Sequence, residues 1–125
     1  MSSPDRQFLI IDADSKIREQ IRGFLQGMGY RNVKECSRVK EAIDVLNEFA
    51  IDCIIADWNT PNASSYTLLK LVRGQKRFQN LCFILMTEAE SESPEDKIVR
   101  AREFQVDGFL LKPFQAHTLE AMLKK

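Results

Sequence analysis

The sequence predicts an α/β domain of three layers, in which helices cover both faces of a five-stranded parallel sheet. Three observations support this prediction. Four short apolar runs show no alternation with polar residues, which is typical of strands buried on both faces. Helical patterns separate the runs, so that strand and helix alternate about five times along the 125 residues. A chain of this length suits one hydrophobic core, and the alternation implies parallel strands joined by right-handed crossovers.

The strands are predicted where the apolar runs lie. These are FLII at 8–11, CIIA at 53–56, LCFILM at 81–86 and GFLL at 108–111. A weaker run at 32–36 is predicted to form a fifth strand at an edge of the sheet. None of the runs approaches the roughly 20 apolar residues needed to cross a bilayer. We therefore expect no transmembrane segment.

The helices are predicted from apolar residues that recur at helical spacing. Two lie near 17–28 and 39–46, a shorter one near 68–72 closes at Gly74, and the last lies near 119–123. The fourth is expected to begin at the segment SPED, with Ser93 as the capping residue. Pro94 then occupies the first turn, and Asp96 supplies an acidic residue three positions after the serine.

Composition and charge exclude several classes of protein. Eighteen basic residues balance eighteen acidic ones, so we expect no direct contact with nucleic acid or with an anionic membrane. The N-terminal segment MSSPDRQ lacks the features of a signal peptide, which predicts a cytoplasmic protein. Cys36, Cys53 and Cys82 are scattered without CxxC spacing, which argues against a disulfide framework and a zinc site. His117, the single histidine, is predicted to be a surface side chain.

A polar residue stands at the end of each apolar run. Asp12 follows the first run, Asp57 the run at 53–56, Thr87 the run at 81–86 and Lys112 the last. Because ligands of open parallel sheets bind at the carboxyl ends of the strands, these four side chains are expected to converge. Each alone has a plainer explanation as a helix cap, a turn residue or a solvated side chain, and together they favour a site.

The residue types at this predicted site suit phosphoryl chemistry. Paired carboxylates with oxygen-rich surroundings bind a hard divalent cation, usually Mg²⁺. A carboxylate oxygen can attack phosphorus, while an ammonium and a hydroxyl bind the charge of the product. The sequence therefore predicts a site that receives a phosphoryl group.

Four segments carry a resemblance to the receiver domain of bacterial response regulators, the CheY-like family. They are IID at 10–12, DWNTPN at 57–62, MTEAE at 86–90 and LLKPF at 110–114. The resemblance covers essentially the whole chain. It implies one receiver domain over residues 1–125, with a flavodoxin-like (βα)5 fold and strand order 2-1-3-4-5. Such domains signal in two-component phosphorelays and are not enzymes in the usual sense.

The resemblance also implies roles for individual residues. Asp57 would accept phosphoryl from a sensor histidine kinase or a phosphotransfer protein. Asp12, Asp57 and the backbone carbonyl of Asn59 would hold Mg²⁺, while Thr87 and Lys112 would bind the phosphoryl oxygens.

Signalling to a partner is implied as well. Phe109 occupies the position of the aromatic switch residue, and the bond between Lys112 and Pro113 would be cis. Phosphorylation would draw Thr87 inward and remodel the face made by the fourth helix, fifth strand and fifth helix. A downstream protein or a fused output domain would bind that face.

The sequence departs from the receiver pattern near the metal and the acceptor. Ala13 replaces an acidic metal ligand, so Mg²⁺ binding is predicted to be weak. Glu88 follows Thr87 where a small residue is usual, and it would either repel phosphoryl or substitute for the missing metal ligand. Asp14 is the other candidate for that substitution. A glycine common after the acceptor is replaced at 63–65, and the acidic segment at 88–106 is longer than usual.

Two rival functions remain, one from these departures and one from the segment FLIIDADS at 8–15, which resembles the DxD motif of another family. A degenerate receiver would bind partners without taking phosphoryl, and Ala13 and Glu88 support that alternative. A haloacid-dehalogenase-like phosphatase would use Asp12 as nucleophile and Asp14 as acid/base, but DWNTPN would then have no explanation.

Overall fold

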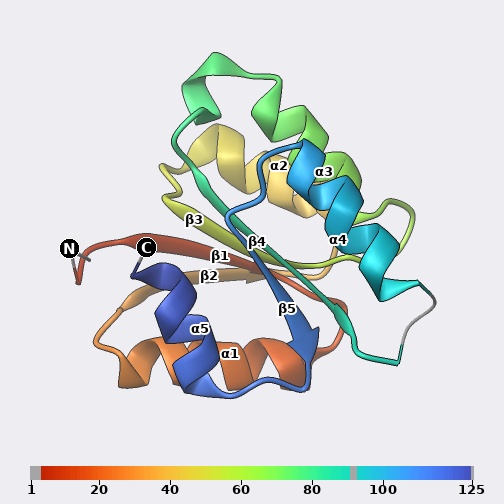
Figure 1. Cartoon of the computed structure of the whole chain (residues 1–125). Coiled ribbons are helices and arrows are strands. Elements are labelled where there is room, and N and C mark those ends of the chain that lie inside the picture. The colour runs from red at the N-terminus through yellow and green to blue at the C-terminus, as the bar shows by residue number, and fades with distance from the viewer. Residues whose placement is uncertain (1–3, 91–92, 125) are drawn as a thin grey trace.

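Five parallel strands form one sheet in the order β2-β1-β3-β4-β5, as Figure 1 shows for this computed structural model. The strands are β1 (Gln7–Ile11), β2 (Asn32–Cys36), β3 (Cys53–Asp57), β4 (Cys82–Glu88) and β5 (Gly108–Lys112). The structure describes residues 4–90 and 93–124, so the ends of the predicted domain and residues 91–92 of the acidic segment lie outside the described residues. The predicted fold class and strand order are confirmed, including the weak run that forms the edge strand β2.

Helices cover both faces of the sheet. They are α1 (Ser15–Gly27), α2 (Val39–Glu48), α3 (Ser65–Arg73), α4 (Pro94–Glu103) and α5 (Ala116–Leu123). In Figure 1, α1 and α5 lie on one face while α2, α3 and α4 lie on the other. A short 3-10 helix, η1 (Lys76–Phe78), was not predicted and follows α3. Among the residues described, no helix has the length and apolar character that a membrane span requires.

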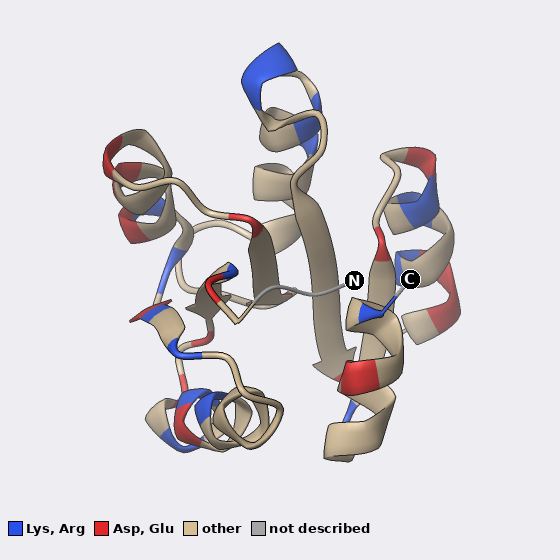
Figure 2. Cartoon of the chain, turned by 90° about the vertical axis from the view of Figure 1, so that its left-hand side faces the viewer, with Lys and Arg blue, Asp and Glu red and all other residues tan. Residues whose placement is uncertain are grey.

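The hydrophobic core has two halves, one on each face of the sheet. Ile21 and Leu25 of α1 pack with α5 against one face. The other face is covered by α2 and α3 and by Ala101 of α4. All five residues of β3 are buried, which explains why its sequence is apolar without alternation. Figure 2 accordingly shows charged residues mainly on the helices and connecting segments, and the central strands carry almost none.

The start of α4 differs from the prediction. Ser93 has a φ of 52°, in the left-handed region, and its side chain makes no capping hydrogen bond. A capping serine needs an extended backbone to direct its hydroxyl at the first turn, so this left-handed conformation explains why Ser93 does not cap. Pro94 does occupy the first turn as predicted. Within α4, Ala101 is the one buried residue, which makes α4 the α-helix with the fewest buried residues.

The segment after β3 forms its turn without the glycine that the receiver pattern has there. Asn62 takes the left-handed conformation, with a φ of 72°, which asparagine tolerates better than most residues. Ser64 then caps α3 by accepting a hydrogen bond from the backbone N–H of Thr67. The chain therefore turns away from the end of β3 without a glycine.

Candidate functional site

The four polar residues at the ends of the apolar runs meet at one rim of the sheet. We call Asp12, Asp57, Thr87 and Lys112 the rim side chains, and all four are buried. The Lys112 Nζ atom lies 2.6 Å from Asp12 Oδ2 and 3.3 Å from Asp57 Oδ1. One ammonium thus joins carboxylates that are 45 positions apart in the sequence, since the parallel strands end at the same edge.

Burial and charge set the protonation of this cluster. Burial raises the pKa of Asp57 to about 6, and the nearby Asp12 carboxylate acts in the same direction. The Lys112 ammonium and the backbone N–H of Asn59 oppose that rise. Burial alone would lower the pKa of Lys112, but hydrogen bonds and charges from the two aspartates outweigh it, so this pKa is raised. Lys112 therefore remains an ammonium.

Asp12 is held by several hydrogen bonds, whereas its neighbours point elsewhere. Its Oδ1 accepts from the backbone N–H of Asp14 at 2.9 Å, and its carbonyl accepts from Arg18 at 2.6 Å. Asp14 caps α1, because its Oδ1 accepts from the backbone N–H of Lys16 at 2.9 Å. Ala13 is exposed between them, at the place where the resemblance implies a second acid.

Thr87 makes a contact that the sequence did not predict. Its Oγ1 lies 3.3 Å from Nζ of Lys97, a residue of α4. The same ammonium lies 5.7 Å from the centre of the Trp58 ring. The guanidinium carbon of Arg100 lies 5.5 Å from the centre of that ring. Two cations of α4 therefore rest on the tryptophan that follows Asp57. No sequence motif marks Lys97, because its reach depends on where α4 sits over the sheet.

An aromatic cluster connects the rim to the face covered by α4. Trp58 stacks on Tyr66 with ring centres 4.9 Å apart and planes 11° apart. Phe104 contacts Tyr66 edge-on, and Phe109 lies 6.3 Å from Trp58. Phe109 is half-buried in β5, next to β4, which carries Thr87. The peptide bond between Lys112 and Pro113 is cis, as the resemblance implied.

Glu88 and Asn59 lie at the mouth of the site. The Glu88 carboxylate is 64% exposed and reaches to 3.9 Å from the Lys112 ammonium. Asn59 is exposed beside Asp57 and bonds its carboxylate through the backbone. Neither residue is buried, so both can change conformation without disturbing the core.

The carboxylates at the rim are oxygen ligands of the chemical type that binds Mg²⁺. Asp12 and Asp57 share one ammonium, which brings two carboxylates together, and such oxygen ligands are those that Mg²⁺ prefers. Across residues 4–90 and 93–124, no group of three His, Cys, Asp or Glu side chains is arranged to hold a metal ion. The two acidic side chains that Lys112 draws together at the rim are thus Asp12 and Asp57.

Comparisons with known proteins agree with this geometry. The family described as the response regulator receiver domain matches residues 8–124. The chemotaxis protein CheY of Pseudomonas aeruginosa is 30% identical over 119 residues, which cover 95% of this chain and 94% of that protein. The structure of the chemotaxis response regulator CheY4 of Vibrio cholerae is similar with a TM-score of 0.83 and 27% identity, covering 96% of this chain and 97% of that one. The signal receiver domain of a histidine kinase from Syntrophus aciditrophicus has a TM-score of 0.83 and 27% identity, covering 95% and 87%.

Proposed function

Because the chain belongs to the family of response regulator receiver domains, which act in two-component signal transduction, we propose that Asp57 is its phospho-acceptor. The observation that carries this proposal is the buried ammonium of Lys112, bonded to Asp57 and Asp12 at the end of the strand that pairs with the Thr87 strand. Residues 1–125 would act as one receiver domain, in the cytoplasm. The match to the receiver family, and the capping role of Asp14, leave no support for the phosphatase alternative.

The transfer itself would use groups of this chain. An ionised Asp57 oxygen attacks phosphorus in line with the leaving group, which in a histidine kinase is a nitrogen of the phosphohistidine. Lys112 binds the negative charge that gathers on the phosphoryl oxygens, and the Thr87 hydroxyl donates a hydrogen bond to one of them. Receiver domains generally bind Mg²⁺ at this acidic pocket, and the ion when bound neutralises phosphoryl charge. In this chain Asp12, Asp57 and the Asn59 carbonyl would hold it.

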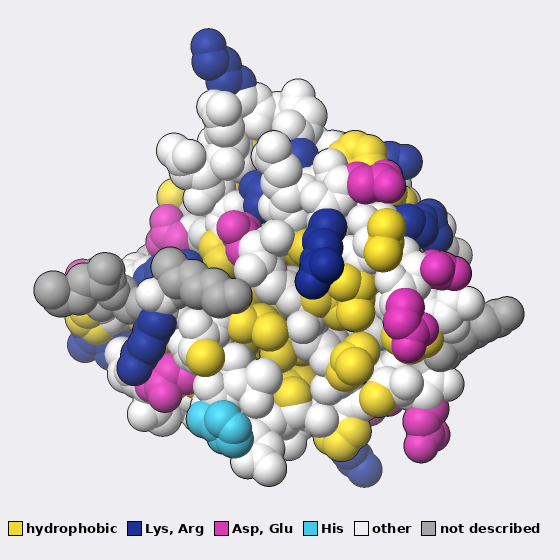
Figure 3. All heavy atoms as spheres, in the orientation of Figure 1, with side chains coloured by type: hydrophobic (Ala, Val, Ile, Leu, Met, Phe, Trp, Pro, Cys, Tyr) yellow, Lys and Arg dark blue, Asp and Glu magenta, His cyan; other side chains and the backbone are white. Residues whose placement is uncertain are grey.

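The signal would leave through the face that we call the output face, comprising α4, β5 and α5. Val99 of α4 and Leu111 of β5 are 56% and 41% exposed, and they are two of the four large apolar side chains that lie exposed among the described residues. Leu111 also lines a shallow depression of about 400 Å³ together with Phe109 and Phe114. Figure 3 shows hydrophobic side chains gathered in the middle of this side of the molecule. We propose that a downstream protein or fused output domain docks here once Thr87 and Phe109 have moved.

Phosphorylation of Asp57 is tested with a small phosphodonor and Mg²⁺. We expect the intact mass to rise by one phosphoryl group in the unaltered chain and to stay constant in Asp57→Asn. A matched control is Asp14→Asn, which removes a neighbouring carboxylate that caps α1 and should leave the mass gain intact. A chain that gains no mass at any donor or metal concentration would instead be a degenerate receiver, as Ala13 and Glu88 suggest.

The metal affinity can be raised by restoring the missing acid. Ala13→Asp adds a carboxylate at an exposed position beside Asp12, so the Kd for Mg²⁺ is expected to fall about tenfold, or about 1.4 kcal/mol. Fluorescence of Trp58, the single tryptophan and the neighbour of Asp57, reports the titration. Ala13→Asn keeps the shape without the charge and should bind as the unaltered chain does. Equal affinities in all three chains would show that residue 13 does not reach the metal.

A further inference from the structure

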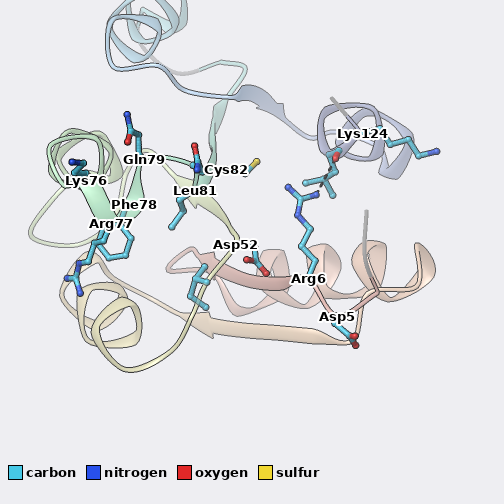
Figure 4. Close-up of a pocket in the computed structure, with 13 residues that line it drawn as sticks. Asp5, Arg6, Asp52, Lys76, Arg77, Phe78, Gln79, Leu81, Cys82 and Lys124 are labelled. Atoms are coloured by element: carbon cyan, nitrogen blue, oxygen red, sulfur yellow. Dashed lines mark hydrogen bonds between the residues drawn. The ribbon is translucent and has the colours of Figure 1, made fainter. Parts of the chain in front are cut away.

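A second feature lies at the opposite edge of the sheet, where the strands begin. A pocket of about 730 Å³ opens there between the start of β1, η1 and the end of α5. Figure 4 shows Arg6, Asp52 and Cys82 among the residues that line it. None of these residues takes part in the phosphoryl site, which lies at the other ends of the same strands. Cys82 brings a thiol to the wall of this pocket.

The sheet places a second thiol beside the first. Cys53 begins β3 and Cys82 begins β4, and the two are paired residues of neighbouring parallel strands. Both side chains pack into the same half of the core, against α1 and α5, so they project from the same face of the sheet. Neighbouring strands lie about 4.8 Å apart, which is within the range of Cα separations that a disulfide can bridge.

The two thiols differ in access to solvent. Cys53 is fully buried, whereas Cys82 is partly exposed in the pocket. Arg6 enters the same pocket, where its Nη1 donates to the carbonyl of Leu123 at 3.2 Å. A partly exposed thiol beside a fixed cation is the setting in which cysteines react, and a buried thiol next to it is placed to react second.

The acidity of the thiols follows the same order. The pKa of Cys82 is lowered, chiefly by hydrogen bonding with the Cys53 thiol and further by the charges of Arg6 and Arg73. Burial and the Asp107 carboxylate act against that lowering. The pKa of Cys53 is raised for the converse reason. Cys82 is therefore the thiol that ionises first, with the Cys53 proton retained beside it.

We propose that Cys82 and Cys53 form a dithiol site that hydroperoxides oxidise to a disulfide. The Cys82 sulfur attacks an oxygen of the hydroperoxide, so that an S–O bond forms, the O–O bond breaks and an alcohol, or water from hydrogen peroxide, leaves. The Cys53 sulfur then attacks the Cys82 sulfenic acid, forming the S–S bond and releasing water with the Cys53 proton. In balance, two thiols lose two electrons and two protons, and the hydroperoxide is reduced by two electrons.

Cys36 provides an internal control for this chemistry. It is a free thiol at the end of β2, buried at the other face of the sheet. Burial, together with the Glu41 carboxylate, raises its pKa to about 11. In the native chain at neutral pH, Cys82 is expected to alkylate at least about tenfold faster than Cys36.

The test exposes the reduced native chain to hydrogen peroxide, removes the peroxide, denatures the chain and blocks free thiols with a maleimide. We expect one maleimide adduct in place of three, a loss of two hydrogens in intact mass, and a peptide that links Cys53 to Cys82. Cys36→Ser should form the same link and leave no free thiol. Cys53→Ser should stop at the sulfenic acid of Cys82, which dimedone traps.

Two results would overturn the proposal. One is three maleimide adducts after a peroxide exposure that fully oxidises glutathione in a parallel tube. The other is a disulfide that includes Cys36. Both are read in the unaltered chain, so neither depends on whether the serine variants fold. Phosphorylation of Asp57 plays no part in the assay, and the two proposals therefore stand or fall separately.

Discussion

Replacing Lys112 with methionine is expected to lower the free energy of unfolding by about 3–5 kcal/mol at pH 7. The ammonium is the cation that pairs with both Asp12 and Asp57 at 2.6 and 3.3 Å, and its side chain is 7% exposed. Without it, two buried carboxylates repel each other in a site that water solvates poorly, which is the costly way to break a buried ion pair. Urea denaturation followed by circular dichroism measures the loss.

A lysine on the surface provides the matched control. Lys124 pairs with Glu120 at 3.7 Å and is 68% exposed, so Lys124→Met should change stability by no more than about 0.5 kcal/mol. The loss in Lys112→Met should shrink at pH 5, since the freed carboxylates can then take up protons. Equal urea midpoints for Lys112→Met and Lys124→Met at pH 7 would contradict this prediction. They would show that the pairing of Lys112 with Asp12 and Asp57 adds nothing to the stability of the fold.

Asp57→Asn is expected to stabilise the chain at neutral pH when divalent metal is chelated, by roughly 2 kcal/mol. Burial raises the pKa of Asp57 from 3.8 to about 6 in the folded state. A raised pKa means that the folded chain binds more protons than the unfolded chain between about pH 4 and 6. The contribution of this aspartate to stability is therefore complete below pH 4 and is lost as the pH rises through 6. Asparagine does not ionise and avoids that loss.

The measurement is a series of urea denaturations from pH 4 to 8 with a chelator present. The advantage of Asp57→Asn over the unaltered chain should vanish toward pH 4 and grow to its full size by pH 7. Asp44→Asn, at an exposed position of α2, is the control and should show no such trend. A constant difference at every pH would show that Asp57 titrates normally and that burial does not govern its charge.

The sequence predicted the rim because strand ends are local features. Asp12, Asp57, Thr87 and Lys112 each follow an apolar run, and a parallel sheet brings such positions together whatever the details of packing. The contact of Lys97 with Thr87 needed the placement of a whole helix over the sheet, which no local pattern encodes. In the same way, the pairing of Cys53 with Cys82 depends on the register of the two strands. Ser93 does not cap α4 because of its backbone conformation, which the residue type alone does not determine.

The shallow seating of α4 has a consequence for the energetics of signalling. This helix buries one residue and otherwise rests on Trp58 and Thr87 through Lys97 and Arg100. Because α4 buries only Ala101, little apolar area has to be uncovered for the helix to shift. Coupling between two equilibria is reciprocal. A partner that binds more tightly to a shifted α4 must therefore also favour the modification of Asp57 that shifts this helix. A bound target would thus shift the equilibrium of aspartate modification by the same factor by which that modification tightens the binding of the target.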